Sequence, residues 1–391
     1  MMDLKPLPFR SSLDQYQRQA EELLEAYKSG DSEAIQRIKG HHPRFLDSKI
    51  PWLPKNLPDS EVLSAALELS DAQLTIARWY DFQSWTALTE YVDAVTEENS
   101  PVCRFESAVE AVINGDAAAL QLLLRDDPEL VRARSTRVTH FDPPMHRATL
   151  LHYVAANGVE GYRQRTPKNA VEVAEILLRA GAEADALADM YGEPCTTMSL
   201  LVSSCHPAEA GVQVALAETL LDFGASIEGQ GSGKWRSPLM TALAFGYGRT
   251  AEALAKRGAR VDHIAAAAGL GRLADARRLL AAADGESRQR ALALAAQHGH
   301  EDIVRLLLDA GEDPNRYNPD GNHSHSTPLH QAVIAGHDAV VRLLVERGAG
   351  LDIKDTIYQS TPLGWAIYSG QTEIEKYLRA HGAKTSEELG Q

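Results

Sequence analysis

The sequence predicts an all-α fold, a solenoid in which short helix-turn-helix units stack side by side. The first observation is internal repetition: "STPLHQAVIAGHDAVVRLLVERGAGLDI", residues 326 to 353, is matched 34 positions later by "STPLGWAIYSGQTEIEKYLRAHGAK". The second is the spacing of apolar residues, which is helical in both halves of each copy, with a glycine between the halves. Self-similarity at a fixed period of this length is the signature of a stacked repeat array.

The repeat that begins at Thr327 shows what each position contributes. Thr327 can cap a helix, and Pro328 suits the first helical turn, where its missing N–H is not needed. The Gly336–His337 pair ends this helix, and "AVVRLLVERG" after it has the apolar spacing of a second helix. Gly348 can take the left-handed conformation that ends the second helix. One unit is therefore expected to be helix, turn, helix and loop.

These residues resemble the ankyrin repeat, whose family pattern includes T-P-L-H-x-A, a following Gly and, one helix later, L-L-x-x-G-A. Only the copy at Thr327 keeps the complete T-P-L-H-x-A box. Weaker copies lie upstream, at residues 105–131, 149–185, 197–227, 237–262, 263–283 and 291–315. The resemblance implies an ankyrin solenoid of about eight units over residues 105–391, the last unit being a C-terminal cap. It also implies structural roles, between repeats or at turns, for His152, His300, His330 and His337.

Residues 1–104 fit the repeat pattern less well and are expected to form an N-terminal helical capping region. Residues 18–46 predict two short helices that turn at Ser29-Gly30-Asp31. Residues 47–59 contain three prolines and are expected to be a linker or an extended tie across the surface. Helical spacing resumes at residues 70–95, which resemble an element found ahead of ankyrin repeats in many bacterial proteins. Its aromatic stripe is expected to pack against the array as a cap, and an aromatic binding site is the alternative.

The composition narrows the classes of function. With 54 acidic and 39 basic residues, the formal charge is −15, which disfavours nucleic acid and anionic membranes as partners, because both attract clustered Lys and Arg. The cysteines, Cys103, Cys195 and Cys205, lack C-x-x-C spacing, so neither a disulfide framework nor a zinc ribbon is indicated. The chain has no signal-peptide apolar region and no apolar run long enough to span a membrane. We therefore expect a cytoplasmic protein without a cofactor.

The resemblance also implies where a partner binds. In ankyrin-repeat proteins the loop that joins one repeat to the next projects as a hairpin-like finger, and the fingers and inner helices form a concave binding face. Here long fingers are expected near residues 140, 190, 235, 320 and 357, whereas those near 262 and 285 are short. This spacing predicts a notch in the array. The implied function is a scaffold that recognises a protein or peptide.

Each long finger contains an aromatic residue, and arginines lie near several of them, a composition typical of binding hot spots. The residues predicted to contact the partner are Phe141, Tyr191, Trp235, Arg236, Tyr317 and Tyr358, with Arg137 and Arg316 as neighbours. Any one of these aromatic residues can instead stabilise its own finger, so the prediction of a binding surface depends on the whole set of residues. The insertion at residues 160–169 is expected either to project from the opposite rim or to form an ordinary turn.

An enzyme, or a protein that binds a small molecule or a metal, is the alternative function. Histidine and carboxylate side chains are ligands for zinc and other transition metals, and they also transfer protons. Two fingers contain such residues: His140, Asp142 and His146 in one, and Asp320, His323 and His325 in the other. Neither group has the H-E-x-x-H spacing that places two imidazoles on one side of a helix. We therefore favour the scaffold over the enzyme.

Two other patterns are set aside. Residues 229–237, "GQGSGKWRS", resemble a phosphate-binding P-loop, but Glu228 stands where its first glycine is required and Trp235 where it needs Ser or Thr. Cys205 and His206 are adjacent in the sequence, and neighbouring side chains on a helix point in different directions, which argues against a nucleophile pair.

Overall fold

The computed structural model describes residues 6–230 and 237–390. By its internal contacts the chain divides into two units, Met1–Ala225 and Ser226–Gln391. The division expected between residues 104 and 105 falls inside the first unit and stays a prediction. Among the described residues, no helix is both long and apolar enough to cross a membrane.

The first unit begins with helices that share one apolar core. They are α1 (Leu13–Lys28), α2 (Ser32–His41), α3 (Asp59–Leu63), α4 (Leu69–Trp79) and α5 (Trp85–Thr96). The expected turn between the first two helices is confirmed: Gly30 has a φ of 80°, and the Asp31 carboxylate accepts the N–H groups of Glu33 and Ala34 at the start of α2. Helices α1 and α2 both pack on α4, and the aromatic residues of α4 and α5 contribute to this core.

The rest of the first unit is a set of helix pairs. The pairs are α6 (Pro101–Asn114) with α7 (Ala117–Asp126), α8 (Leu150–Val154) with α9 (Ala170–Arg179), and α10 (Thr197–Leu201) with α12 (Gln213–Asp222); α11 (Cys205–Glu209) lies within the last pair. The first helices contact one another in the series α6, α8, α10, and the second helices in the series α7, α9, α12. The unit therefore has two helical layers, as a stack of helical hairpins requires.

One finger of this unit is a β-hairpin. Strand β1 (Leu187–Met190) pairs antiparallel with β2 (Glu193–Thr196), with Ala188 opposite Cys195 in register. Its turn residues, Tyr191 and Gly192, both have positive φ values, 56° and 76°, as a two-residue hairpin turn with the right twist requires. The turn thus presents Tyr191 at the end of the hairpin.

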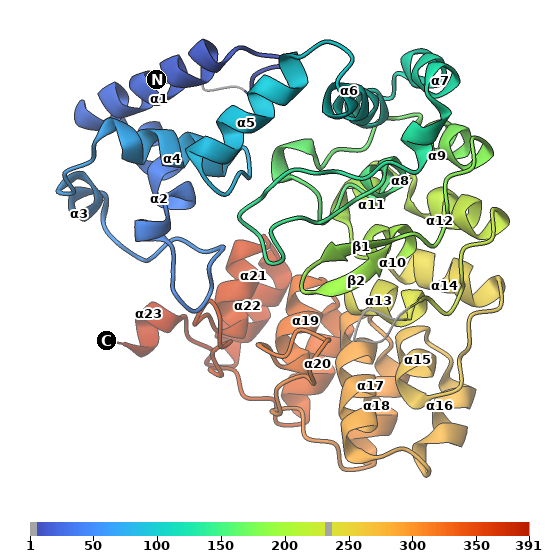
Figure 1. The fold of residues 1–391 in the computed structure, drawn as a ribbon. Coiled ribbons are helices and arrows are strands. Elements are labelled where there is room, and N and C mark those ends of the chain that lie inside the picture. Colours follow the sequence, from blue (N-terminus) through green and yellow to red (C-terminus); the bar gives the residue numbers. More distant parts are fainter. Residues whose placement is uncertain (1–5, 231–236, 391) are drawn as a thin grey trace. The chain divides into compact units, whose positions relative to one another are not determined.

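The second unit repeats the helical pair five times. The pairs are α13 (Pro238–Ala244) and α14 (Gly248–Lys256), α15 (Ile264–Gly269) and α16 (Leu273–Leu280), α17 (Gly285–Gln297) and α18 (Glu301–Asp309), α19 (Pro328–Ile334) and α20 (Asp338–Glu346), and α21 (Pro362–Tyr368) and α22 (Thr372–Ala380); the short α23 (Ser386–Leu389) follows (Figure 1). The first helices pack in the series α13, α15, α17, α19, α21, and α16, α18, α20, α22 form the second layer. Leucines at equivalent positions, Leu329 and Leu363, are fully buried between the layers.

The histidine of the T-P-L-H box joins neighbouring repeats, as expected. Nδ1 of His330 accepts the backbone N–H of Thr327 at 3.3 Å, and its Nε2 lies 3.3 Å from the carbonyl oxygen of Ser360 in the next repeat. His152 has the same arrangement with Thr149 and with the carbonyl of Cys195, at 3.2 and 3.4 Å. Burial lowers the pKa of each imidazole to about 4, so both are neutral near pH 7.

The Gly-His pair at the turn between two helices is also structural. A Cβ on Gly299, whose φ is 76°, would lie 2.6 Å from Nδ1 of His337 in the following repeat. His337 Nε2 lies 3.0 Å from the carbonyl oxygen of Gln297, so the ring is held against this glycine. Gly271 and His300 repeat the arrangement, with His300 Nε2 3.0 Å from the carbonyl of Gly269. The structural interpretation of these histidines is therefore confirmed.

Candidate functional site

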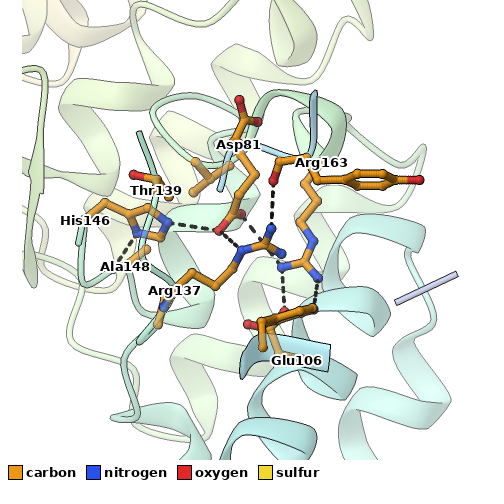
Figure 2. A network of polar contacts seen from close by, with 12 residues as sticks. Asp81, Glu106, Arg137, Thr139, His146, Ala148 and Arg163 are labelled. Carbon is orange, nitrogen blue, oxygen red and sulfur yellow. Dashed lines mark hydrogen bonds and ion pairs between the residues drawn. The ribbon is translucent and has the colours of Figure 1, made fainter. Parts of the chain in front are cut away.

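A buried cluster of charged side chains links the N-terminal helices, the first finger and the insertion of the first unit (Figure 2). Its members come from three segments: Glu106 from α6, Arg137 and His146 from the finger before α8, and Glu160 and Arg163 from the segment between α8 and α9. Each of these five side chains is at most 3% exposed. We call them the buried ion cluster.

Arg163 lies in the centre of the cluster. Its guanidinium is 2.6 Å from the carboxylate of Glu106 and 3.8 Å from that of Glu160. The hydroxyl of Tyr91 on α5 is hydrogen-bonded to both Arg163 and Glu106. It accepts an N–H of Arg163 at 3.2 Å and donates to the Glu106 carboxylate at 3.0 Å. The insertion is therefore neither a projecting rim nor an ordinary exposed turn, since its arginine is buried against α5 and α6.

Arg137 makes the second buried ion pair, at 3.1 Å from Glu160. It also donates to the backbone carbonyl of Tyr80 at 2.9 Å and to the hydroxyl of Tyr162 at 2.8 Å, and its guanidinium lies 4.1 Å from the ring centre of Phe82. The expectation that Arg137 accompanies an exposed aromatic residue is wrong. Its side chain faces the N-terminal helices because the finger follows the α4–α5 turn, where Phe82 and Thr139 form a bridge.

Charge pairing fixes the protonation of Glu160. Burial acts to raise the pKa of its carboxyl group, but Arg137 and His146 outweigh this effect and hold the pKa well below its usual range. His146 Nε2 lies 3.1 Å from this carboxylate, and its Nδ1 accepts the N–H of Ala148 at 3.1 Å. The carboxylate is thus ionised, paired and enclosed, which suits a structural contact between segments and not proton transfer to a substrate.

The other two residues of that sequence cluster lie apart from His146. His140 packs against Phe141 with ring centres 4.5 Å apart, and its Nδ1 lies 3.9 Å from the carboxylate of Asp81. Asp142 is exposed. Throughout residues 6–230 and 237–390, no group of three or more His, Cys, Asp or Glu side chains is placed to hold a metal ion.

The histidines of the other predicted cluster, in the second unit, have separate partners. His323 Nε2 lies 2.8 Å from the carbonyl oxygen of Ala244 at the end of α13, and His325 lies 3.8 Å from the Asp355 carboxylate. Asp355 itself accepts the N–H groups of Tyr358 and Ser360 and the indole N–H of Trp365. This carboxylate therefore orders its own finger.

The finger that contains His323 folds back over shorter repeats. His298 at the end of α17 also lies close to α13, with Nε2 2.8 Å from the carbonyl of Leu243, and the amide of Gln297 donates to the carbonyl of Ala244 at 2.9 Å. Both contacts cross the pair α15–α16, whose first helix is short and consists mainly of alanine. Because the side chains of α15 are small, residues at the end of α17 can hydrogen-bond to the carbonyl groups at the end of α13.

The aromatic residues of the fingers are exposed, as predicted, where the structure describes them. They are Phe141, Tyr191, Tyr317 and Tyr358; Trp235 and Arg236 lie outside the described residues. Two hydroxyls are anchored: Tyr191 donates to the Asn157 side chain at 2.6 Å and Tyr317 to the carbonyl of Lys354 at 2.7 Å. The rings thus brace fingers and also face solvent, and their role in binding stays a prediction.

Sequence reasoning missed a second exposed apolar set, at the C-terminal ends of first helices. Ile334 ends α19, and Ile367 and Tyr368 end α21, which packs beside it; Tyr368 is 88% exposed. We call these three residues the helix-end patch. The signal available in the sequence was their position two or three residues before the turn glycines, Gly336 and Gly370.

Comparison with known proteins agrees with the geometry. A family model described as "Ankyrin repeats (3 copies)" matches residues 292–388. The chain is an ankyrin-repeat protein. Ankyrin repeats are protein–protein interaction modules, so this ankyrin-repeat protein has the architecture of a protein-binding scaffold.

Several curated proteins resemble the ankyrin-repeat chain. "Ankyrin repeat and KH domain-containing protein mask-1" of Caenorhabditis elegans is 28% identical over 359 residues, which are 88% of this chain and 12% of that protein. "Ankyrin repeat and SAM domain-containing protein 6" of Mus musculus is 39% identical over 100 residues, 26% of this chain and 11% of that protein. The chain thus spans about a tenth of the length of these relatives. The human ASB11 ankyrin repeat domain is a solved structure with 20% identity and a TM-score of 0.37, covering 71% of this chain and 98% of that one.

Proposed function

We propose that this ankyrin-repeat protein is a recognition scaffold that binds a protein or peptide through its finger tips and the ends of its first helices. In the second unit the binding surface consists of the helix-end patch together with Tyr317 and Tyr358. In the first unit the finger tips with Phe141 and Tyr191 have the same role. No catalytic step is assigned to the histidines of either finger.

The observation that carries the proposal is the helix-end patch. Water contact at large apolar side chains is unfavourable by about 25 cal/mol per Å², and Ile334, Ile367 and Tyr368 retain such contact on two adjoining helices. Both helices are held rigidly by buried leucines and by the His330 contact between repeats. A rigid surface with exposed aromatic and aliphatic groups is what a protein partner buries at the centre of an interface.

The anchored tyrosines support the same function. Ordering a flexible side chain on binding costs about 0.5–1.5 kcal/mol, and this cost is reduced where the side chain is already fixed. Tyr317 is held by its bond to Lys354, and Tyr358 lies in the finger that the Asp355 carboxylate orders. The Tyr317 ring and the backbone of Tyr358 are thus fixed before a partner arrives, and both side chains remain exposed.

The test compares surface variants of the full chain in partner capture from cells, followed by affinity measurement on the purified partner. Tyr368→Ser and Ile334→Ser should each weaken binding at least about tenfold, which corresponds to about 1.4 kcal/mol. Tyr377→Ser is the matched control, because Tyr377 lies on the second-helix layer beside Arg342. A partner whose affinity is unchanged by both patch variants, or is lowered equally by Tyr377→Ser, would overturn the proposal.

A further inference from the structure

A second exposed feature lies far from the repeats in sequence, in the loop at residues 46–55. We call it the Trp52 loop. Its tryptophan is 71% exposed, whereas Trp79 and Trp85 are half-buried and Trp365 is buried. The exposure is not confined to one side chain, because Pro51 and Pro54 are exposed beside it and Ile50 and Leu53 are half-buried. Its neighbours thus extend the apolar tip beyond a single exposed residue.

This loop is ordered by its own hydrogen bonds, in place of the linker or extended tie that its prolines predict. The Asp47 carboxylate accepts the N–H groups of Lys49 and Ile50 at 2.7 and 3.0 Å, and the Asp47 N–H donates to the carbonyl of Leu53 at 2.8 Å. The N–H of Leu53 donates back to Ile50 at 2.9 Å. The loop therefore closes on itself as a compact turn that presents Trp52 outward.

Its base is fixed to the core of the first unit. Phe45, directly before the loop, is buried, and its carbonyl accepts the N–H of Lys55 at 2.7 Å. Leu46 and Pro54 form an isolated bridge between the two ends. Because both ends are bonded and two prolines restrict the backbone, little conformational entropy remains to be lost when the tip is buried.

The charge around the tip is positive in a chain that is otherwise acidic. Arg44, Lys49 and Lys55 are exposed, and none of them has an ion pair among the described residues. The carboxylate within the loop, that of Asp47, is occupied by the loop amides, which lower its pKa. The Lys55 ammonium donates to the backbone carbonyl of Arg44 at 2.7 Å, which holds this cation at the base of the loop.

We propose that the Trp52 loop is a docking element for a protein partner that presents an apolar pocket rimmed by carboxylates. The indole fills the pocket, and the cations around it pair with the acidic rim. Tryptophan and arginine are the residues that dominate binding energy at such sites. A membrane surface fits less well, because the loop has one tryptophan and the chain as a whole, with a charge of −15, is repelled by anionic lipid. This proposal uses none of the residues proposed above as a binding surface and does not depend on them.

A random-peptide display library panned on the full chain provides the test, with fluorescence polarisation on the selected peptides. Peptides whose binding depends on Trp52 should combine Asp or Glu with large apolar residues. Trp52→Ala should weaken the affinity for these peptides at least about tenfold, and Lys49→Glu should weaken it several-fold. The affinity of the parent chain should also fall as the salt concentration is raised. Leu122→Ala, at an exposed leucine on α7, is the control and should change nothing.

Three outcomes would overturn the proposal. One is a panning experiment that yields no peptide sensitive to Trp52→Ala. Another is a Trp52-dependent set of peptides without acidic enrichment. The third is cosedimentation with phosphatidylserine vesicles that Trp52→Ala abolishes, which would reassign the loop to lipid. Because Trp52 is exposed, its alanine variant should keep the unfolding midpoint of the parent chain, so a folding defect would not obscure these results.

Discussion

The guanidinium of Arg163 lies 2.6 Å from the carboxylate of Glu106, and neither side chain is more than 1% exposed. Arg163 belongs to the insertion between α8 and α9, whereas Glu106 lies on α6. The pair therefore ties the insertion to the first helix of the preceding repeat. Together with Arg137 and Glu160, the Arg163–Glu106 pair forms a buried group of charges. These charges contact one another and the surrounding protein groups in place of water.

Removing Arg163 should be strongly destabilising. In Arg163→Met, Glu106 and Glu160 remain buried with less compensating charge, and breaking a buried ion pair typically costs about 3–5 kcal/mol. Urea unfolding followed by circular dichroism measures the loss. Arg179→Met is the control, because Arg179 pairs with Glu175 on the surface and should cost less than about 1 kcal/mol. Equal losses for the two variants would contradict a structural role for the cluster; Glu106→Gln serves if Arg163→Met does not fold.

Asp81 should make the first unit less stable as pH rises toward neutrality. Burial raises the pKa of its carboxyl group from 3.8 to about 7, although the N–H of Gly161 donates to it at 2.6 Å. Between these two values the native chain binds more protons than the unfolded chain. The unfolding free energy therefore falls with rising pH, by at most about 1.4 kcal/mol per pH unit.

Asp81→Asn isolates this effect, because asparagine keeps an acceptor for Gly161 but cannot ionise. Relative to the parent chain, the variant should gain stability between about pH 5 and pH 8. Denaturant titrations at both pH values give the comparison. A difference between the two chains that does not change with pH would show that Asp81 titrates in the native state as it does in the unfolded chain.

His152 and His330 should remain neutral well below pH 6. Burial lowers the pKa of each imidazole to about 4 in the native state, from the ordinary histidine value of 6.5. The unfolded chain then binds more protons in this interval, so the stability that these residues contribute is lost as pH falls from about 6.5 toward 4. NMR titration of the imidazole carbons, assigned with His152→Gln and His330→Gln, measures the values directly. Native titration near 6.5 for either ring would refute the assignment.

Gly299→Ala should destabilise the second unit more than Gly311→Ala. Both glycines have positive φ values, 76° and 93°, so alanine is strained at both. A Cβ at Gly299 would also lie 2.6 Å from Nδ1 of His337, whereas one at Gly311 meets nothing within 4 Å. Thermal unfolding of the two variants gives the difference. In a His337→Ala background the excess should disappear; if it persists, the His337 ring is not its cause.

The helical hairpins could be predicted from the sequence because their determinants are local. Thr327, Pro328 and Gly336 fix the start and end of one helix within ten residues, and the pattern recurs 34 positions later. His330 and His337 could be assigned for the same reason, since their partners lie in the next repeat at a constant offset. The solenoid follows from such repetition.

The buried ion cluster could not be predicted, because its contacts join segments far apart in the sequence. Arg137 looked like any arginine of an exposed finger, but its acceptors are Glu160 and the carbonyl of Tyr80, 57 residues before it. His146 lies close to His140 in the sequence, but its side chain faces Glu160. The side of the finger that faces the core depends on how the α4–α5 turn packs. The sequence has no periodic pattern from which this packing could be predicted.

The contacts of His298 and His323 with α13 have a consequence for how the array can change in length. In most repeat proteins each unit touches its immediate neighbours alone, so insertion or deletion of one unit leaves the others intact. Here Leu243 and Ala244 accept bonds that pass over the α15–α16 pair. Duplicating or excising residues 263–284 would leave these carbonyl groups without donors. The number of units between α13 and α17 is therefore fixed by the side chains of His298 and His323, which lie outside those units.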